Sequence, residues 1–371
     1  MTTSSGSDAP LRVAWLDSCK GIGILLVVLG HVLSHLPLPV GSAMQHIYAF
    51  IYLFHMPLFF FLSGYLLKPR PKFGQYAYKK AVHLLIPYFA AYFLLLTFGI
   101  PVPAHGHSKL KILGQLAFQV GWGGKLLVSR YTAFWFLTCL FLSQQYVNFL
   151  LVRFRLTAVV VVTLAGLALA YVDQLIFPNL VLPWDANVVL FAAPYMVAGY
   201  LWRSWRSESN WTAWLATVGV VLAIWICFIR SDAALDMKQG NYGIPIISLF
   251  CSLGCIWWVM RLAKWIDHLP RLAKALSRIG EFSLMIMLFH LTILLILMRG
   301  LHLQKASDCF VLFVLVSLLS IALAALLNRF ALTRALLNGS ERDWTRIFGR
   351  PHGALQSEAV NEEIRRRDVL P

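Results

Sequence analysis

Charged residues are scarce in this sequence. Only 13% of its 371 residues are Asp, Glu, Lys or Arg, whereas 59% are hydrophobic, and the mean hydropathy is +0.70. A soluble domain usually carries about 25% charged residues, which it needs to cover its surface. The shortage excludes an ordinary water-soluble domain and predicts a membrane protein.

Acidic residues are scarcer than basic ones, 16 against 32, so the formal net charge is +16. In a soluble protein this excess would favour nucleic acid as the partner. In a membrane protein it instead indicates which side of the bilayer the loops face. We therefore expect membrane lipids, and no nucleic acid, among the partners.

The sequence also lacks Cys-x-x-Cys pairs, and its first apolar run is not expected to be a cleavable leader. Its six cysteines lie in or beside apolar runs and form no Cys-x-x-Cys pair, so we expect small core residues and no metal site. Residues 1–18 are polar and lack the basic start of a signal peptide, so the first apolar run is predicted to remain as a span. No internal repeat at a fixed period is present.

Ten apolar runs have about the 20 residues needed to cross a bilayer. We predict an all-α, polytopic transmembrane helical bundle with a polar segment at 1–18, a membrane domain at 19–331 and a polar tail at 332–371. The segment 104–128 is interrupted by glycines and is predicted to be interfacial or re-entrant. The predicted spans are 19–37, 47–67, 82–102, 132–151, 156–177, 186–203, 211–229, 244–260, 281–298 and 309–331.

The basic residues orient this bundle. With the N-terminus in the cytoplasm, 24 of the 32 Lys and Arg residues fall on the inner side and 8 on the outer side. Cytoplasmic loops carry such an excess, so both termini are predicted to be cytoplasmic. A single missed span would reverse this assignment for one terminus.

The first span begins with the stretch LDSCKGIGILLVVLGH, which contains Asp17, Lys20 and His31. Lys20 and His31 are eleven residues apart, about 16 Å and three turns on a helix, so they share a face. An ionisable side chain at this depth is a functional candidate. The alternatives are a packing histidine and an interfacial Asp17–Lys20 anchor. We place His31 and Asp17 in the catalytic set, with Asp17 holding Lys20.

Two later motifs carry further deep histidines. LFHMPLFFFLSGYL contains His55 and, further on, Ser63; a short loop joins it to the first span, so His55 is added to the catalytic set. GEFSLMIMLFH contains Glu281 and ends at His290. For His290 a packing role is slightly favoured over direct catalysis, so His290 and Glu281 are assigned as supporting residues.

Cations and an aromatic complete the candidate site. YKKAVHLLIPYF places Lys79 and Lys80 at the cytoplasmic end of the third span. Each alone marks an inner loop, but together with Lys20 they form a candidate phosphate clamp at the mouth of the cavity. Trp135 in FWFL is either an aromatic-belt residue or a supporting residue.

Taken in order, these motifs resemble those of the acyltransferase-3 family of integral membrane acyltransferases, over about residues 15–330. The opening motif is most similar to the branch of fucose 4-O-acetylases and exopolysaccharide acetyltransferases of the xanthan type. The resemblance implies transfer of an acyl group, often acetyl from acetyl-CoA, to a hydroxyl of a lipid-linked or polymeric glycan. It further implies a multi-pass protein of the bacterial inner membrane without a tightly bound cofactor.

The resemblance also implies residue roles. The family's basic residue, ten residues and a histidine are matched by Lys20 and His31, although many members carry arginine where this chain has Lys20. The Ser-Gly motif is matched by Ser63 and Gly64. Lys20, Lys79, Lys80 and Ser63 are therefore assigned to donor binding. The acceptor is expected from the outer side, where the loops carry Asp173, Asp185, Asp232 and Asp236.

Two other classes of function remain as alternatives. A proton-coupled transporter or flippase of a lipid-linked saccharide also suits ten spans, inner cations and buried histidines. Against it, the halves show no matching broken helices and intramembrane acids are nearly absent. A membrane scaffold would not explain three deep histidines.

Overall fold

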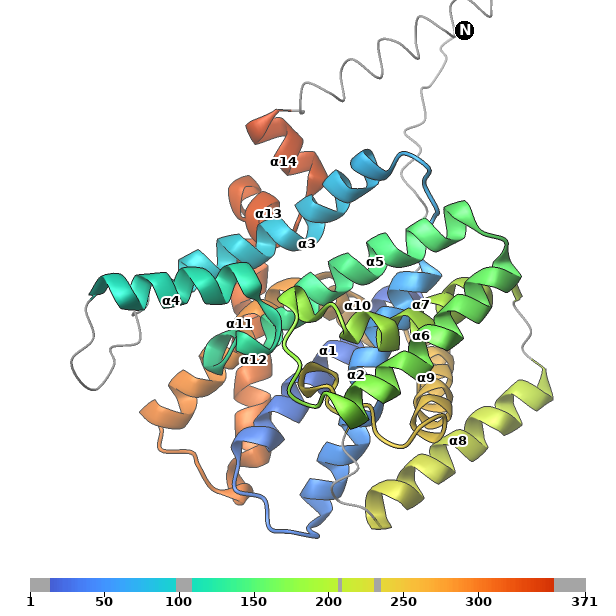
Figure 1. Ribbon diagram of the computed structural model, residues 1–371. Coiled ribbons are helices and arrows are strands. Elements are labelled where there is room, and N and C mark those ends of the chain that lie inside the picture. Colours follow the sequence, from blue (N-terminus) through green and yellow to red (C-terminus); the bar gives the residue numbers. More distant parts are fainter. Residues whose placement is uncertain (1–13, 98–108, 206–208, 230–234, 350–371) are drawn as a thin grey trace, which may run out of the picture.

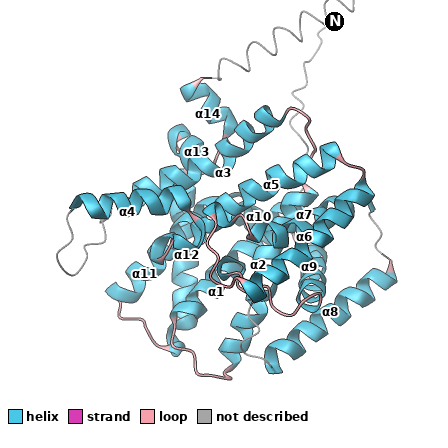
Figure 2. Cartoon of the chain, in the orientation of Figure 1, coloured by secondary structure: helices cyan, strands magenta, loops and turns pink. Residues whose placement is uncertain are grey.

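The computed structural model describes residues 14–97, 109–205, 209–229 and 235–349. Within these ranges the chain is helical and contains no strand (Figure 2), as predicted. The helices, labelled in Figure 1, are α1 (Ala14–His35), α2 (Ala43–Tyr65), α3 (Phe73–Leu96), α4 (Lys109–Trp122), α5 (Trp135–Arg153), α6 (Leu156–Ile176), α7 (Val188–Trp205), α8 (Asn210–Ile229), α9 (Ile247–Ile266), α10 (Pro270–Glu281), α11 (Ser283–Gly300), α12 (Cys309–Leu327), α13 (Ala331–Leu337) and α14 (Glu341–Phe348).

Each of the ten predicted spans overlaps one helix. Nine helices in the described ranges are long and apolar enough to cross a membrane: α1, α2, α3, α5, α6, α8, α9, α11 and α12. The third begins nine residues before the predicted start, so Lys79 and Lys80 lie on α3 itself. The helix continues there because its backbone hydrogen bonds do not require an apolar surrounding. The chain is thus an all-α, polytopic helical bundle.

The sixth predicted span corresponds to α7, which is not among the nine. This helix is mostly buried and packs on α2, α5 and α6. A helix surrounded by protein does not need a lipid-facing apolar surface. Arg203 near its end donates to the Leu67 carbonyl just after α2, at 3.5 Å. Its 18 residues span about 27 Å, close to the hydrocarbon thickness.

The first helix is the centre of the bundle. α1 packs on α2, α9, α10, α11 and α12, whereas α8 lies at the edge (Figure 1). Below, the end of the bundle that carries Lys20 and Lys79 is called the inner end, following the basic-residue assignment. The opposite end, where α1 finishes and α2 begins, is called the outer end.

Three glycines allow helix backbones to touch. Gly64 of α2 faces the Met196 carbonyl of α7, and Gly199 of α7 faces the Phe61 carbonyl of α2. At the inner end, Gly280 of α10 abuts the Asp17 carbonyl in α1. A Cβ at any of these glycines would overlap the opposite backbone, and small residues at helix crossings are typical of membrane bundles.

Three parts of the chain outside the predicted spans are helical. α4 occupies part of the segment 104–128, whose first five residues lie outside the described residues, and α10 lies in the predicted inner loop before residue 281. The predicted polar tail at 332–371 contains α13 and α14, and residues 350–371 lie outside the described part of the chain.

The start of this tail is docked on α3 (Figure 1). Glu341 pairs with Lys79 at 2.7 Å between Oε2 and Nζ, and the Trp344 indole N–H donates to the Tyr78 hydroxyl at 3.0 Å. The His83 ring bonds the Gly339 carbonyl. These contacts join the tail to the inner end of the bundle.

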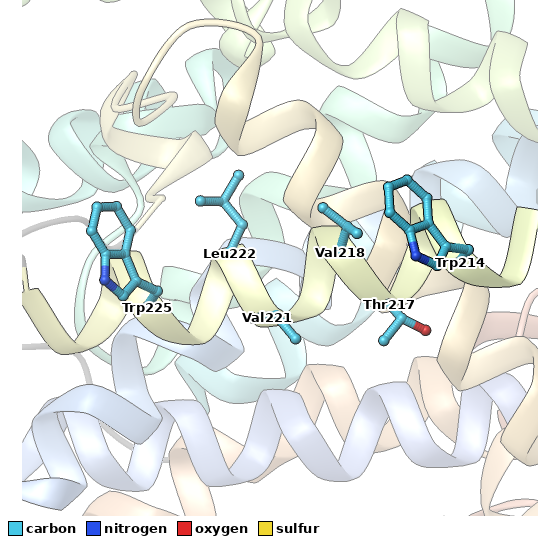
Figure 3. A pocket seen from close by; sticks show the side chains of 6 residues that line it. All are labelled: Trp214, Thr217, Val218, Val221, Leu222 and Trp225. Carbon is cyan, nitrogen blue, oxygen red and sulfur yellow. The ribbon is translucent and has the colours of Figure 1, made fainter.

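A groove of about 380 Å³ lies along α8, at the edge of the bundle (Figure 3). It contains one polar side chain, Thr217, whose hydroxyl already bonds Ala213 and Trp258. Because the groove is apolar and lacks an ionisable group, it suits lipid hydrocarbon and does not qualify as a reaction site. Its lining residues are Trp214, Thr217, Val218, Val221, Leu222 and Trp225.

Candidate active site

The fold brings the deep histidines together around α1. The rings of His31 and His290 lie 5.2 Å apart between centroids, although 258 residues separate them in the chain. Tyr52 of α2 lies 6.4 Å from His31 and 4.7 Å from His55. We call His31, His55, His290 and Tyr52 the histidine cluster. His290 is the direct neighbour of His31, and His55 joins through Tyr52.

Backbone contacts define the proton positions on two of these rings. Nδ1 of His55 lies 2.9 Å from the Ile51 carbonyl, and Nδ1 of His290 lies 2.9 Å from the carbonyls of Ile286 and Met287. A carbonyl only accepts, so we infer that Nδ1 carries the proton in both rings. In the neutral rings Nε2 is then the acceptor. Nε2 of His290 is buried and has no hydrogen-bond partner within the described chain.

His31 is the least buried histidine of this cluster. His55 is 4% exposed and His290 is fully buried, whereas His31 remains partly accessible. A general base or nucleophile must touch its substrate. The arrangement therefore favours His31 as the reacting imidazole, with His290 and His55 as buried neighbours.

Asp17 lies away from this cluster. It pairs with Lys20 at 3.0 Å between Oδ1 and Nζ, in agreement with the i, i+3 spacing. Both residues lie at the inner end of α1, and Asp17 precedes His31 by 14 residues, about 21 Å along a helix. The structure places Asp17 where it holds Lys20, and at a distance that excludes contact with the His31 ring.

The other predicted donor-binding residues are each engaged locally. Lys79 pairs with Glu341, and the Lys80 ammonium lies 5.4 Å from the centre of the Tyr76 ring. Ser63 accepts a hydrogen bond from the Gln144 side chain at 2.7 Å. These contacts do not join Lys20, Lys79 and Lys80 into a single cluster, so an anionic ligand would have to compete for Lys20 and Lys79.

The two remaining predicted residues differ in burial. Trp135 is 6% exposed at the start of α5 and packs at an angle on Phe136, so it belongs to the core instead of a lipid-facing aromatic belt. Glu281 ends α10 at the inner end, next to Gly280. His290 lies nine residues beyond it in α11, so Glu281 is about 13 Å from the histidine cluster along the chain.

Two lysines that the sequence interpretation did not single out shape the outer loops. The buried carboxylate of Asp185 accepts the Lys125 backbone N–H at 2.9 Å, and the Lys125 ammonium donates to the Pro178 carbonyl at 3.2 Å. Lys238 is 5% exposed and donates to the Leu127 carbonyl. A buried lysine has no signature in a hydropathy profile. Of the outer acids named above, Asp232 lies outside the described residues.

Burial raises the pKa of the Asp185 carboxyl to about 7, even though the Lys125 N–H and the Lys238 ammonium oppose the shift. The folded protein therefore binds more protons than the unfolded chain between about pH 4 and pH 7, and stability falls as the pH rises through this window. We expect Asp185→Asn, which keeps the oxygen that accepts from Lys125, to raise the melting temperature at pH 8 and to raise it much less at pH 5.

Thermal unfolding of the purified protein in detergent at both pH values checks this. The difference between variant and wild type isolates Asp185, because every other ionisable group is the same in both proteins. An equal change in melting temperature at the two pH values would contradict it.

Comparison with known proteins gives two findings. A family model described as an acyltransferase domain matches residues 13–329, a range that includes all three deep histidines. The nodulation protein NolL of Mesorhizobium japonicum is 27% identical over 224 residues, which cover 57% of this chain and 55% of NolL. The chain thus spans about half the length of this curated relative. No solved structure matches.

Proposed function

The chain belongs to the acyltransferase-3 family of integral membrane acyltransferases, and from this premise we propose that it moves an acetyl group from cytoplasmic acetyl-CoA to a sugar hydroxyl. The acceptor is a lipid-linked or exported polysaccharide, and the location is the bacterial inner membrane. The observation that carries the proposal is the half-buried His31, whose ring lies 5.2 Å from that of His290 between centroids, in the interior of a helical bundle.

The reaction needs one group that accepts and returns a proton. A neutral His31 ring takes the proton from the sugar hydroxyl while the hydroxyl oxygen attacks the thioester carbonyl carbon. The C–O ester bond forms, the C–S bond breaks, and the proton passes to the CoA sulfur to give the free thiol. An acyl-histidine formed on His31 before the sugar attacks is the other route open to the same ring.

The donor is proposed to enter from the inner end. Its phosphates are anions, and Lys20, Lys79 and Lys80 are the candidate cations there. Two of these lysines already form ion pairs. Lys20 pairs with the carboxylate of Asp17, and Lys79 pairs with that of Glu341. Donor phosphates would replace these carboxylates, and the pantetheine arm would extend along α1 toward His31, about 16 Å from Lys20.

Substitution of Lys20 tests the donor assignment. We expect Lys20→Ala to raise the KM for acetyl-CoA about tenfold, the equivalent of one charge-assisted hydrogen bond, and to leave kcat nearly unchanged. Lys20→Arg should restore donor binding because it keeps the charge. Thermal stability is measured alongside, since Asp17 loses the Lys20 partner. An unchanged KM in folded Lys20→Ala protein would refute the phosphate assignment.

The proposed reaction itself is tested in proteoliposomes with acetyl-CoA labelled on the acetyl group and a lipid-linked glycan acceptor. Loss of thioester with equal appearance of label on the glycan supports the enzyme. Movement of glycan across the membrane without thioester consumption would instead support the transporter. Glycan extracted from a deletion strain should lack ester signals in its NMR spectrum.

A further inference from the structure

A row of aromatic rings leads from the outer end of α2 to the histidine cluster. Tyr48 and Tyr52 are four residues apart on one face of α2, with ring centroids 4.2 Å apart. The Tyr52 ring in turn lies 6.4 Å from the His31 ring, measured between centroids. Tyr48 lies five residues from the start of α2. The row therefore begins near the outer surface and ends at the proposed reacting imidazole.

The two ends of this row are less buried than its middle. Tyr48 and His31 are partly accessible, whereas Tyr52 between them is 8% exposed. If the row served only as packing between α1 and α2, burial would be expected to increase steadily toward the interior. His31, deeper along the row, is instead half-buried.

The end of α1 adds polar groups to the same region. The ring of His35 lies 6.4 Å from that of His31, and its Nδ1 bonds the His31 carbonyl at 2.8 Å. Because that carbonyl only accepts, Nδ1 carries the proton and the neutral ring presents Nε2 as an acceptor. The Ser34 hydroxyl is exposed beside it. Hydrogen-bonding groups and aromatic faces thus occur together at the outer end.

This combination suits a sugar ring. A pyranose has apolar C–H faces, which pack on aromatic rings, and a rim of hydroxyls, which need hydrogen-bonding partners. Tyrosine supplies both a ring face and a hydroxyl in one side chain. A lipid tail would need no hydroxyls, and a carboxylate or phosphate would call for cations, which this row of rings does not contain.

We propose that Tyr48 and Tyr52 bind the acceptor sugar and conduct its reacting hydroxyl to His31. This rests on the proposed function, and it assigns the sugar-binding residues that the proposed function leaves open. Tyr48 packs against a sugar ring at the entrance. Tyr52 binds the sugar ring that carries the reacting hydroxyl, next to the His31 imidazole.

The test compares acceptor and donor kinetics in proteoliposomes. We expect Tyr48→Ala to raise the KM for the glycan acceptor about tenfold, the loss of one aromatic contact, with the KM for acetyl-CoA unchanged. Tyr48→Phe should raise the KM for the glycan acceptor much less, because phenylalanine keeps the aromatic ring. Tyr52→Phe removes only a hydroxyl and should lower kcat/KM for the acceptor about tenfold.

His46→Ala provides a matched control. His46 lies two residues before Tyr48, where its ring stacks on Phe228 and bonds the Cys227 carbonyl of α8, so it faces away from the row. It should leave the acceptor KM unchanged. If Tyr48→Ala left the acceptor KM unchanged, or raised the donor KM equally, the sugar-binding assignment would be overturned. Absence of transfer by wild-type protein would instead be a failure of the proposed function.

Discussion

Replacement of His31 by alanine is expected to lower acyl transfer by about 10³-fold, the typical contribution of a positioned general base. His31 is the least buried of the three clustered histidines, and its direct neighbour His290 is fully buried. His290 therefore cannot contact a substrate without a rearrangement of α11. For this reason the loss should appear in kcat, and the KM for the donor should change little.

The measurement is the initial rate of labelled acetyl transfer in membranes that contain equal amounts of folded protein. His290→Gln is the matched comparison, because it leaves the accessible ring in place while removing its neighbour, and we expect a smaller loss. Label trapped on wild-type protein after an acid quench, and absent from His31→Ala protein, would identify the acyl-histidine route. Wild-type turnover in well-folded His31→Ala protein would remove His31 from the mechanism.

Addition of one methyl group at Gly64 or Gly199 is expected to destabilise the protein by about 3 kcal/mol or to prevent folding. Each glycine faces a backbone carbonyl on the partner helix, and the added Cβ would overlap it. A carbonyl within a helix cannot rotate away as a side chain can. The helices α2 and α7 would have to separate, and α2 carries His55 and Tyr52 of the histidine cluster.

Thermal unfolding and the fraction of monodisperse protein in detergent measure this effect for Gly64→Ala and Gly199→Ala. The matched control is Gly74→Ala in α3, since a Cβ there meets no atom within 4 Å. In a helix this change should be neutral or slightly stabilising. A melting temperature of Gly64→Ala equal to that of the control would mean that α2 and α7 are not in backbone contact.

The structure also explains why the helices α10 and α14 were not predicted. The prediction rested on apolar runs of about 20 residues, and α10 has only 12 residues, with Arg271, Lys274 and Arg278 among them. Its cations counted toward an inner loop because composition alone does not separate a short polar helix from a loop. α14 was predicted as part of a polar tail for the same reason. Its position depends on Glu341 and Trp344 meeting α3.

The candidate site was predicted in part. Spacing on one helix was sufficient to predict the Asp17–Lys20 pair, because residues three apart on a helix are neighbours whatever surrounds them. Spacing could not show that Asp17 lies away from the catalytic histidines. A motif shows which residues are near in sequence, but it does not show which of them are neighbours in the fold. The buried Lys238 and the raised pKa of Asp185 depend on loops that meet only in the folded chain.

The amino-acid sequence by itself determined the membrane class, the helical class and the approximate positions of the long apolar helices, because apolar length acts locally along the chain. It also supplied the motifs that indicate an acyltransferase. Only the tertiary structure decided that His290 is the neighbour of His31, that His55 contacts Tyr52 and that Glu341 pairs with Lys79. These pairings depend on how helices far apart in the chain pack, and helix packing is set by the shapes of whole surfaces.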